Sequence, residues 1–182
     1  SSGSAVAIAA NYAVAAVGTE TSGSITSPSS LNSVVGLKPT IGSLSRTGIV
    51  PISSTLDTPG PMTKNVIDNL LMFIYMIGKD ELDPASLQLE EDSFSDEYDT
   101  ALREKKIGVL KPLLSDSIYA ATIKKIKEAG AEVIEITPPE ISYKGFITLL
   151  NIDMKYDLPK YLKNNADTSV FIKSIKDVIA FN

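Results

Sequence analysis

Histidine and cysteine are both absent from this 182-residue sequence. Without histidine, neither a Ser-His-Asp nor a Cys-His catalytic site can be built within these residues, and histidine metal clusters are excluded too. Without cysteine, disulfides, thiol nucleophiles and cysteine-ligated zinc are excluded. Any acid–base catalyst encoded here must therefore be a lysine, a carboxylate, a tyrosine or a second serine.

The sequence also lacks an excess of positive charge and a long apolar run. Its formal net charge is −5, so a direct nucleic-acid partner is not indicated. No apolar stretch reaches the roughly 18 residues that a membrane-spanning helix needs, so no membrane partner is evident. The absence of cysteine fits a reducing compartment, and we favour a cytoplasmic location.

An initiator methionine is missing as well, because the sequence opens with Ser1-Ser2-Gly3-Ser4. We interpret the chain as a fragment of a longer protein or a processed product, with any targeting signal upstream.

The first 61 residues alternate between apolar and Gly/Ser-rich segments. Alanine and valine dominate residues 4–16, which predicts a buried helix that leads into a short strand near 13–17. Within the Gly/Ser/Thr-rich stretch 18–33, Ser27-Pro28 predicts the N-cap and first position of a short helix. Val34 to Thr40 is expected to form a short strand and turn, and residues 41–61 mostly loop.

A strongly apolar segment, residues 64–77, predicts a buried helix capped by Thr63. It is followed by an acidic stretch, because nine of residues 80–99 are Asp or Glu. A solvated connector is the more ordinary interpretation of such a run than a metal site.

The C-terminal half predicts a β-α-β unit followed by helix. Residues 107–110 and 132–137 are expected to form strands, and residues 117–129 an amphipathic helix between them. Two strands joined in this way are expected to be parallel. Residues from 146 onward are expected to be helical, with a break or a new helix start at 157–159, where Pro159 occurs.

The segment from Gly18 to Pro28 has the composition of a catalytic turn. Glycines allow a tight turn and close approach of a ligand, and consecutive N–H groups could converge on one oxyanion. A serine at the end of such a turn would lie beside those donors. An ordinary surface loop has the same composition, so both interpretations stay open on the pattern alone.

A much longer ordered match involves the first 63 residues. Its elements are Ser2-Gly3-Ser4-Ala5, Gly18-Thr19-Glu20-Thr21-Ser22-Gly23-Ser24-Ile25, Pro28, Val35-Gly36-Leu37-Lys38-Pro39-Thr40, Gly42, Ser45-Arg46, Gly48, Pro51, Leu56-Asp57 and Gly60-Pro61-Met62-Thr63. In order and spacing they resemble the amidase signature family, whose pattern runs G-G-S-S-G-G-S, then G-T-D-T-G-G-S-I-R-x-P, V-G-L-K-P-T and L-D-x-x-G-P-M. The match is dense over residues 1–78 and looser through the β-α-β unit.

The resemblance implies a catalytic triad of lysine, a serine in a cis peptide, and a nucleophilic serine, which here is Ser24. A serine hydroxyl needs a base, and in this family a neutral lysine takes its proton through the bridging serine. An ungapped match puts the bridging serine one position before Ser1, and Ser1 then matches the serine that follows the bridging serine in the family. If the alignment shifts by one residue, Ser1 is itself the bridging serine. The lysine lies upstream in the family, so these residues alone are expected to be inactive.

The resemblance also implies an oxyanion hole built by the backbone N–H groups of Thr21, Ser22, Gly23 and Ser24. Three positions depart from the family pattern. Glu20 stands where Asp is usual, Ser22 replaces a Gly, and Thr26 replaces the usual Arg. The change at Thr26 removes a charge beside the site.

The implied fold is α/β, with a mixed, largely parallel sheet flanked by helices and incomplete at its N-terminal side. We expect one amidase-signature domain, comprising a signature core at 1–79, an acidic connector at 80–101, and the β-α-β unit with the helical segment at 102–182. Core surface left uncovered by missing parts would favour homo-oligomers.

The implied function is hydrolysis of a carboxylic amide C–N bond through an acyl-enzyme on Ser24. The partner is a small-molecule amide substrate, and no metal or cofactor is expected. The ending, 177–182, resembles the subgroup that includes peptide amidase. The alternatives are the amidase component of a tRNA-dependent amidotransferase, a non-catalytic binding relative, and an N-terminal nucleophile hydrolase that uses the α-amine of Ser1 as base.

Overall fold

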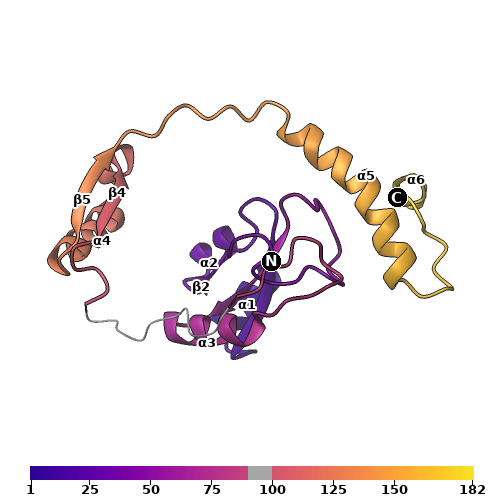
Figure 1. Ribbon diagram of the computed structural model, residues 1–182, viewed down its shortest axis with the longest axis horizontal. Helices are drawn as coiled ribbons and strands as arrows, with labels where there is room; N and C mark the ends of the chain where they lie inside the picture. Colours follow the sequence, from indigo (N-terminus) through magenta and orange to yellow (C-terminus); the bar gives the residue numbers. More distant parts are fainter. Residues whose placement is uncertain (90–99) are drawn as a thin grey trace. The chain divides into compact units, whose positions relative to one another are not determined.

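The computed structural model describes residues 1–89 and 100–182, which divide into two compact units. The first unit contains residues 1–89 and 144–182, and the second contains residues 100–143 (Figure 1). Part of the predicted acidic connector, residues 90–99, lies outside the described residues.

The first unit contains a three-stranded antiparallel sheet in the order β1-β3-β2, formed by β1 (Ala15–Glu20), β3 (Thr58–Thr63) and β2 (Val35–Gly36). β3 was missed in the sequence, where residues 41–61 were predicted to be mostly loop. Its two prolines cannot donate to a ladder, which argues against a central strand. They are accommodated because Pro61 and Pro59 stand opposite Val17 and Thr19 and point their backbone groups away from β1.

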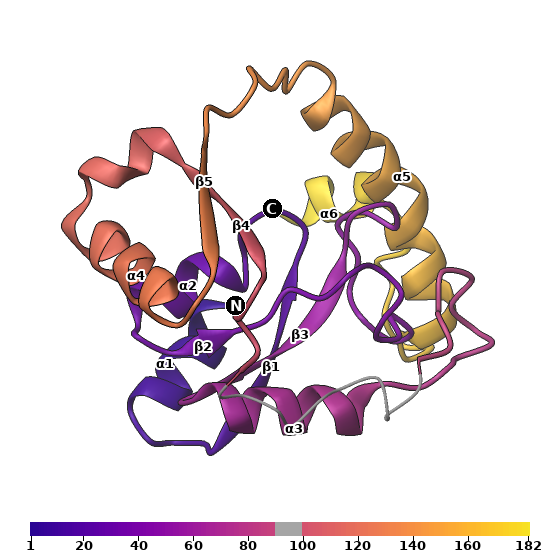
Figure 2. The same cartoon turned by 60° about the vertical axis from the view of Figure 1, so that its left-hand side comes forward.

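Three helices accompany this sheet: α1 (Ser2–Ala9), α2 (Thr26–Leu31) and α3 (Val66–Met76). α1 packs on β1, and α3 packs on β3 (Figure 2). Ala5 of α1, Ile25 and Met62 of β3 are fully buried together, with Val34 packed against them. Ile25 lies directly before α2, so this core supports the turn between β1 and α2.

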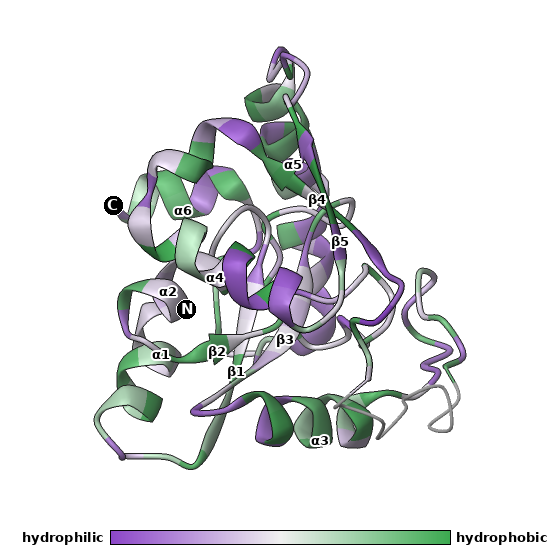
Figure 3. Ribbon diagram, turned by 90° about the vertical axis from the view of Figure 1, so that its left-hand side faces the viewer, coloured by the Kyte–Doolittle hydropathy of each residue, from purple (hydrophilic) through white to green (hydrophobic). Residues whose placement is uncertain are grey.

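The helix expected at 64–77 is present as α3, but its predicted burial is wrong. Asn65, and not Thr63, caps it by accepting a hydrogen bond from the Asp68 amide. Figure 3 shows that α3 is hydrophobic over most of its length. Nevertheless only Asn69 and Phe73 are buried, and Ile67 and Tyr75 are exposed, because the sheet covers one side of the helix.

Residues 80–89 are the part of the acidic stretch that the structure describes, and there Asp83 departs from the prediction of a solvated run. Asp83 is buried, and its carboxylate forms an ion pair with Arg46 at 2.6 Å. Asp80 accepts the hydroxyls of Ser45, at 2.6 Å, and Thr47, at 2.5 Å. A charge paired in this way can be buried, whereas Glu81 of the same stretch is exposed.

Helix α5 (Phe146–Asn165) also belongs to the first unit and is followed by α6 (Ile175–Phe181). The break predicted at 157–159 is wrong, because α5 continues through Pro159. Proline removes one backbone hydrogen bond, and here the helix continues despite that loss. Two hydrogen bonds from residues 53–54 to α5, described below, hold its middle turns.

The second unit is the predicted β-α-β motif. β4 (Lys106–Leu110) and β5 (Glu132–Ile136) pair in parallel, which confirms the expected strand direction. A 3-10 helix, η2 (Lys111–Ser115), precedes α4 (Ser117–Glu128), and Asp116 caps α4 by accepting from the Tyr119 amide at 2.8 Å.

The α/β class with mixed pairing is therefore confirmed. A largely parallel sheet was expected, but among the described strands β3 pairs antiparallel with both β1 and β2, and only β4 and β5 pair in parallel. No helix within the described ranges is long and apolar enough to cross a membrane.

Candidate active site

Ser24 lies in the turn that joins β1 to α2. The strand ends at Glu20 and the helix begins at Thr26, so only five residues connect them. Gly23 has a φ of +81°, a left-handed conformation that glycine adopts without strain. The next residue, Ser24, is partly exposed, and its Oγ forms no hydrogen bond to the described residues. The hydroxyl is accordingly available to a substrate or a base.

The carboxylate of Glu20 organises the end of this turn. Its Oε2 accepts the backbone amides of Ile25 at 2.8 Å and Thr26 at 2.9 Å. Burial raises the pKa of Glu20, but hydrogen bonds from the backbone of Thr26, Ile25 and Gly23 outweigh it and hold the pKa below its ordinary value. The charged carboxylate therefore satisfies amides that have no partner within the helix.

This arrangement corrects the predicted cap of α2. Ser27 and Pro28 were expected at the N-cap and first position, but α2 begins at Thr26 with Ile25 at the N-cap, and no side chain of the cap residue contributes. The carboxylate of Glu20, reaching in from β1, takes the place of a local serine cap. A capping group supplied from the preceding strand has no local sequence signature.

The four residues predicted for the oxyanion hole occupy this same turn. Thr21 and Gly23 are partly buried, Ser22 is exposed, and Ser24 follows them. Thr21 is fixed by its side chain, whose hydroxyl donates to Asp57. The Gly23 backbone lies close enough to Glu20 to lower the pKa of that carboxyl. The direction of the four amides toward a substrate stays a prediction from the resemblance.

Ser1, the second predicted catalytic residue, bonds to the strand and not to Ser24. Its Oγ accepts the backbone amide of Thr19 at 2.9 Å and donates to the Thr19 carbonyl at 3.0 Å. From the same helix, Ser4 Oγ donates to the Val17 carbonyl at 2.9 Å. Ser1 therefore docks the start of α1 against β1, five residues before the nucleophile candidate.

Asp57 is a residue of the site that the sequence interpretation did not assign. It is buried, and its Oδ2 accepts the amides of Ile52 and Ser53, both at 2.8 Å. Its Oδ1 accepts the hydroxyl of Thr21. The signal for it was present in the Leu56-Asp57 match, but a motif does not reveal which distant atom a carboxylate holds.

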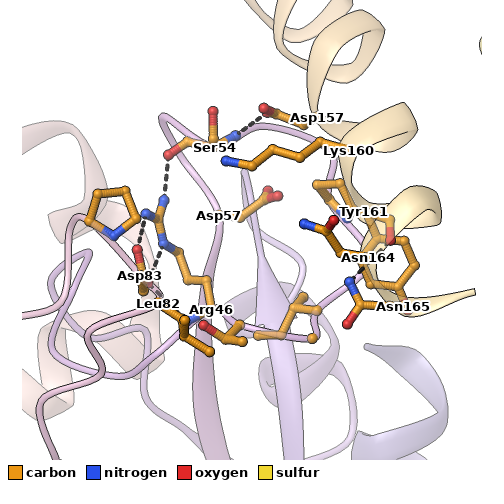
Figure 4. A pocket seen from close by; sticks show the side chains of 15 residues that line it. Arg46, Ser54, Asp57, Leu82, Asp83, Asp157, Lys160, Tyr161, Asn164 and Asn165 are labelled. Atoms are coloured by element: carbon orange, nitrogen blue, oxygen red, sulfur yellow. Dashed lines mark hydrogen bonds and ion pairs between the residues drawn. The ribbon is translucent and has the colours of Figure 1, made fainter.

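A cavity of about 400 Å³ lies beside Asp57, between the loop that contains Arg46 and the second half of α5 (Figure 4). Asp57 and Asp157 contribute carboxylates to its lining, and Lys160 contributes an ammonium group. Arg46 is turned toward Asp83 and the Ser54 carbonyl, so its charge is already paired. Within the described ranges, no group of three or more acidic side chains could hold a metal ion.

Comparison with known proteins identifies the family of the chain. Residues 1–180 match the amidase family, to which the chain belongs. It is 37% identical to an amidase family protein from Bacillus anthracis str. Ames, with a TM-score of 0.87 over 99% of this chain and 37% of that one. It is equally identical to peptide amidase from Stenotrophomonas maltophilia, with a TM-score of 0.81 over 99% of this chain and 39% of that one.

Among curated relatives, the chain is 40% identical over 150 residues to a glutamyl-tRNA(Gln) amidotransferase component from Pelagibacter ubique (strain HTCC1062). That alignment covers 79% of this chain and 31% of the relative. The chain thus spans about a third of the length of the curated relatives it matches.

Proposed function

We propose that the protein containing these residues is an amidohydrolase that cleaves the C–N bond of a carboxylic amide through an acyl-enzyme on Ser24. The observation that carries the proposal is the position of Ser24 in a family-specific turn, partly exposed and with its hydroxyl unbonded to the described residues. Its neighbours on both sides are anchored, Thr21 by Asp57 and Ile25 by Glu20.

In the proposed reaction, Ser24 Oγ attacks the carbonyl carbon while its proton passes through a bridging serine to a neutral lysine. The backbone amides of residues 21–24 stabilise the oxyanion, and loss of one such donor typically costs about 2.7–4 kcal/mol of transition-state stabilisation. The proton then goes to the leaving amine as the C–N bond breaks. Water hydrolyses the ester, which releases the acid and restores Ser24.

The base is proposed to lie outside residues 1–182. Lys38, the lysine within the matched motif, donates to the carbonyl of Pro39 at 3.1 Å, which fits a structural role. A lysine that acts as a base must be neutral, which burial achieves by lowering its pKa. The isolated chain is therefore expected to be inactive, and the substrate is proposed to be a small amide.

The experiment that tests this proposal uses the full-length protein and a fluorophosphonate probe, with the label mapped by mass spectrometry. We expect label on Ser24 that is lost in Ser24→Ala. Ser27→Ala is the matched control, since Ser27 is an exposed serine three residues along the same segment, and it should be labelled like the parent protein. A folded protein without label on Ser24 would indicate a non-catalytic relative, and the mechanism would be abandoned.

A second candidate function is suggested by the 40% identity to a component of a glutamyl-tRNA(Gln) amidotransferase. In that case the same Ser24 chemistry would release ammonia from glutamine for a partner protein. A glutaminase assay with and without the partner proteins separates the two candidates. Activity that depends on the partners favours an amidotransferase component, whereas turnover of simple amides by the protein alone favours a stand-alone amidase.

A further inference from the structure

Helix α5 holds the loop after Pro51 through two carboxylates one helical turn apart. The Ser53 hydroxyl donates to Asp153 Oδ2, and the Ser54 amide donates to Asp157 Oδ2 at 2.7 Å. Residues four apart lie on one face of a helix, so both carboxylates reach the same loop. The second of these contacts is visible in Figure 4.

The same loop is held from its other side by Asp57. Ser53 is fully buried, and its amide donates to Asp57 Oδ2 at 2.8 Å while its hydroxyl faces Asp153. The remaining oxygen of Asp57 accepts the Thr21 hydroxyl. A continuous series of hydrogen bonds therefore runs from Asp153 through Ser53 and Asp57 to Thr21.

We propose that Asp153 is a positioning residue for the catalytic turn, which acts through Ser53 and Asp57 to fix Thr21 at the start of the oxyanion hole. The inference rests on the proposed function of Ser24. It assigns to α5, 100 positions beyond Ser53 in the sequence, a role in the geometry of the acyl-transfer site.

The chemistry of Asp153 suits this role. Its hydrogen bond from the Ser53 hydroxyl, followed by bonds from Thr55, holds the pKa of this carboxyl below its ordinary value. Asp153 is therefore charged at neutral pH, and hydrogen bonds to charged acceptors are stronger than those between neutral groups. Asn keeps one acceptor oxygen at this position without the charge, and Ala keeps neither.

The test compares Asp153→Ala and Asp153→Asn in the full-length protein, with rates normalised to active sites titrated by the fluorophosphonate. We expect Asp153→Ala to lower kcat on the order of ten- to a hundredfold, because small displacements of catalytic groups have costs of that size. KM should stay within about twofold, since ground-state binding is not the affected step. Asp153→Asn should recover part of the loss. Asp167→Asn, a surface carboxylate that bonds Ser169, is the control and should leave kcat unchanged.

A double-mutant cycle with Thr21→Val separates positioning from general support of the fold. If Asp153 acts through Thr21, adding Asp153→Ala to Thr21→Val should lower kcat no further. Fully additive losses, or an unchanged kcat per active site in Asp153→Ala, would overturn the proposal. Ser53→Ala removes the hydroxyl that donates to Asp153, and this variant replaces Asp153→Ala in the test if Asp153→Ala does not fold.

Hydrogen exchange gives a readout that needs no turnover. Amides of residues 20–25 should exchange faster in Asp153→Ala than in the parent protein, and unchanged exchange there would contradict the inference. The two failures are distinguishable. An unlabelled Ser24 in the parent protein would remove the proposed function and this inference with it, whereas normal labelling rates in Asp153→Ala would remove the inference alone.

Discussion

One carboxylate oxygen of Glu20 serves Thr26 twice, accepting its backbone amide at 2.9 Å and its hydroxyl at 3.1 Å. Both residues depart from the family pattern, in which Asp and Arg are usual at these positions. Glutamate extends one methylene further than aspartate, and threonine is much shorter than arginine. In this chain the side chains at positions 20 and 26 are therefore in direct contact beside Ser24.

We predict from this contact that Glu20→Asp destabilises the protein and that Thr26→Arg added to it restores part of the loss, because the longer guanidinium can reach the shortened carboxylate. The shorter carboxylate cannot reach the amides of Ile25 and Thr26 together, and an unpaired buried amide costs about 1–3 kcal/mol. The measurement is the urea midpoint of the full-length single and double variants. Glu81→Asp, at an exposed side chain of the same unit, is the control. A double variant no more stable than Glu20→Asp would show that the two positions are independent.

A second prediction concerns acid stability and the ion pair of Asp83 with Arg46. The hydrogen bond from Arg46 lowers the pKa of Asp83 from 3.8 to about 2. Because the folded-state pKa lies below the unfolded one, the stabilisation is complete above about pH 4–5 and is lost as the pH falls toward 2. This depression corresponds to on the order of 2 kcal/mol at neutral pH.

The measurement for that pair is the urea midpoint of the parent protein and of Asp83→Asn as a function of pH. The parent should be more stable near neutral pH, and the difference should shrink progressively as acid is added. Glu81→Gln should show no such convergence. A difference that stays constant with pH would mean that the loss in Asp83→Asn comes from packing and not from charge.

A third prediction separates a steric clash from backbone strain at two glycines. Gly42 and Gly48 both have positive φ angles, +87° and +80°. A Cβ on Gly42 would come within 1.9 Å of the Ala85 carbonyl oxygen, whereas one on Gly48 would meet nothing within 4 Å. Gly48→Ala should cost about 1 kcal/mol from the left-handed conformation alone.

Gly42→Ala should cost several-fold more, because the segment of residues 85–87 must also move. The Leu87 amide donates to the Gly42 carbonyl at 2.8 Å, and that bond would be lost with the displacement. Thermal melting of the two variants under identical conditions makes the comparison. Equal shifts of the melting temperature would show that the contact with Ala85 relaxes at no cost.

A fourth prediction is that the 182-residue chain self-associates through α3. Ile67, Leu71 and Tyr75, spaced four residues apart on one face, are 59%, 49% and 86% exposed. Light scattering coupled to size exclusion should show a mass that rises with concentration. Ile67→Glu with Leu71→Glu should return the chain toward a monomer, and a monodisperse parent chain at high concentration would contradict the proposed oligomer.

Local pattern predicted the elements whose burial depends on near neighbours. The predicted bounds of β4, α4 and β5 differ from the observed bounds by no more than one residue. The hydrophobic pattern of a strand changes there to that of a helix and back, and Gly130 separates the helix from the second strand. Burial of α3 was overestimated, since an apolar helix in sequence does not reveal how much of its surface the rest of the chain covers. β3 was missed because two prolines resemble a loop when the partner strand is unknown.

The candidate site was located by motif, but its supports were not. The Thr21 contact joins residues 36 positions apart, and the Ser53 contact with Asp153 joins residues 100 apart. Partners at such separations are set by the tertiary fold, and neither hydrophobic period nor turn chemistry encodes them. The same reason explains why the ion pair of Asp83 with Arg46 could not be predicted.

Ser1, the N-cap of α1, and Ser4, within α1, both bond to the side of β1 that faces away from β3. Ser1 and Ser4 occupy backbone groups of Thr19 and Val17 that point away from β3. An unpaired strand edge is a template for pairing with another chain. Here hydroxyl groups from a helix occupy the hydrogen-bonding positions that an incoming strand would need, immediately before the turn with Ser24. The amide and carbonyl of Thr19 and the carbonyl of Val17, close to Ser24, are thereby unavailable for β-augmentation.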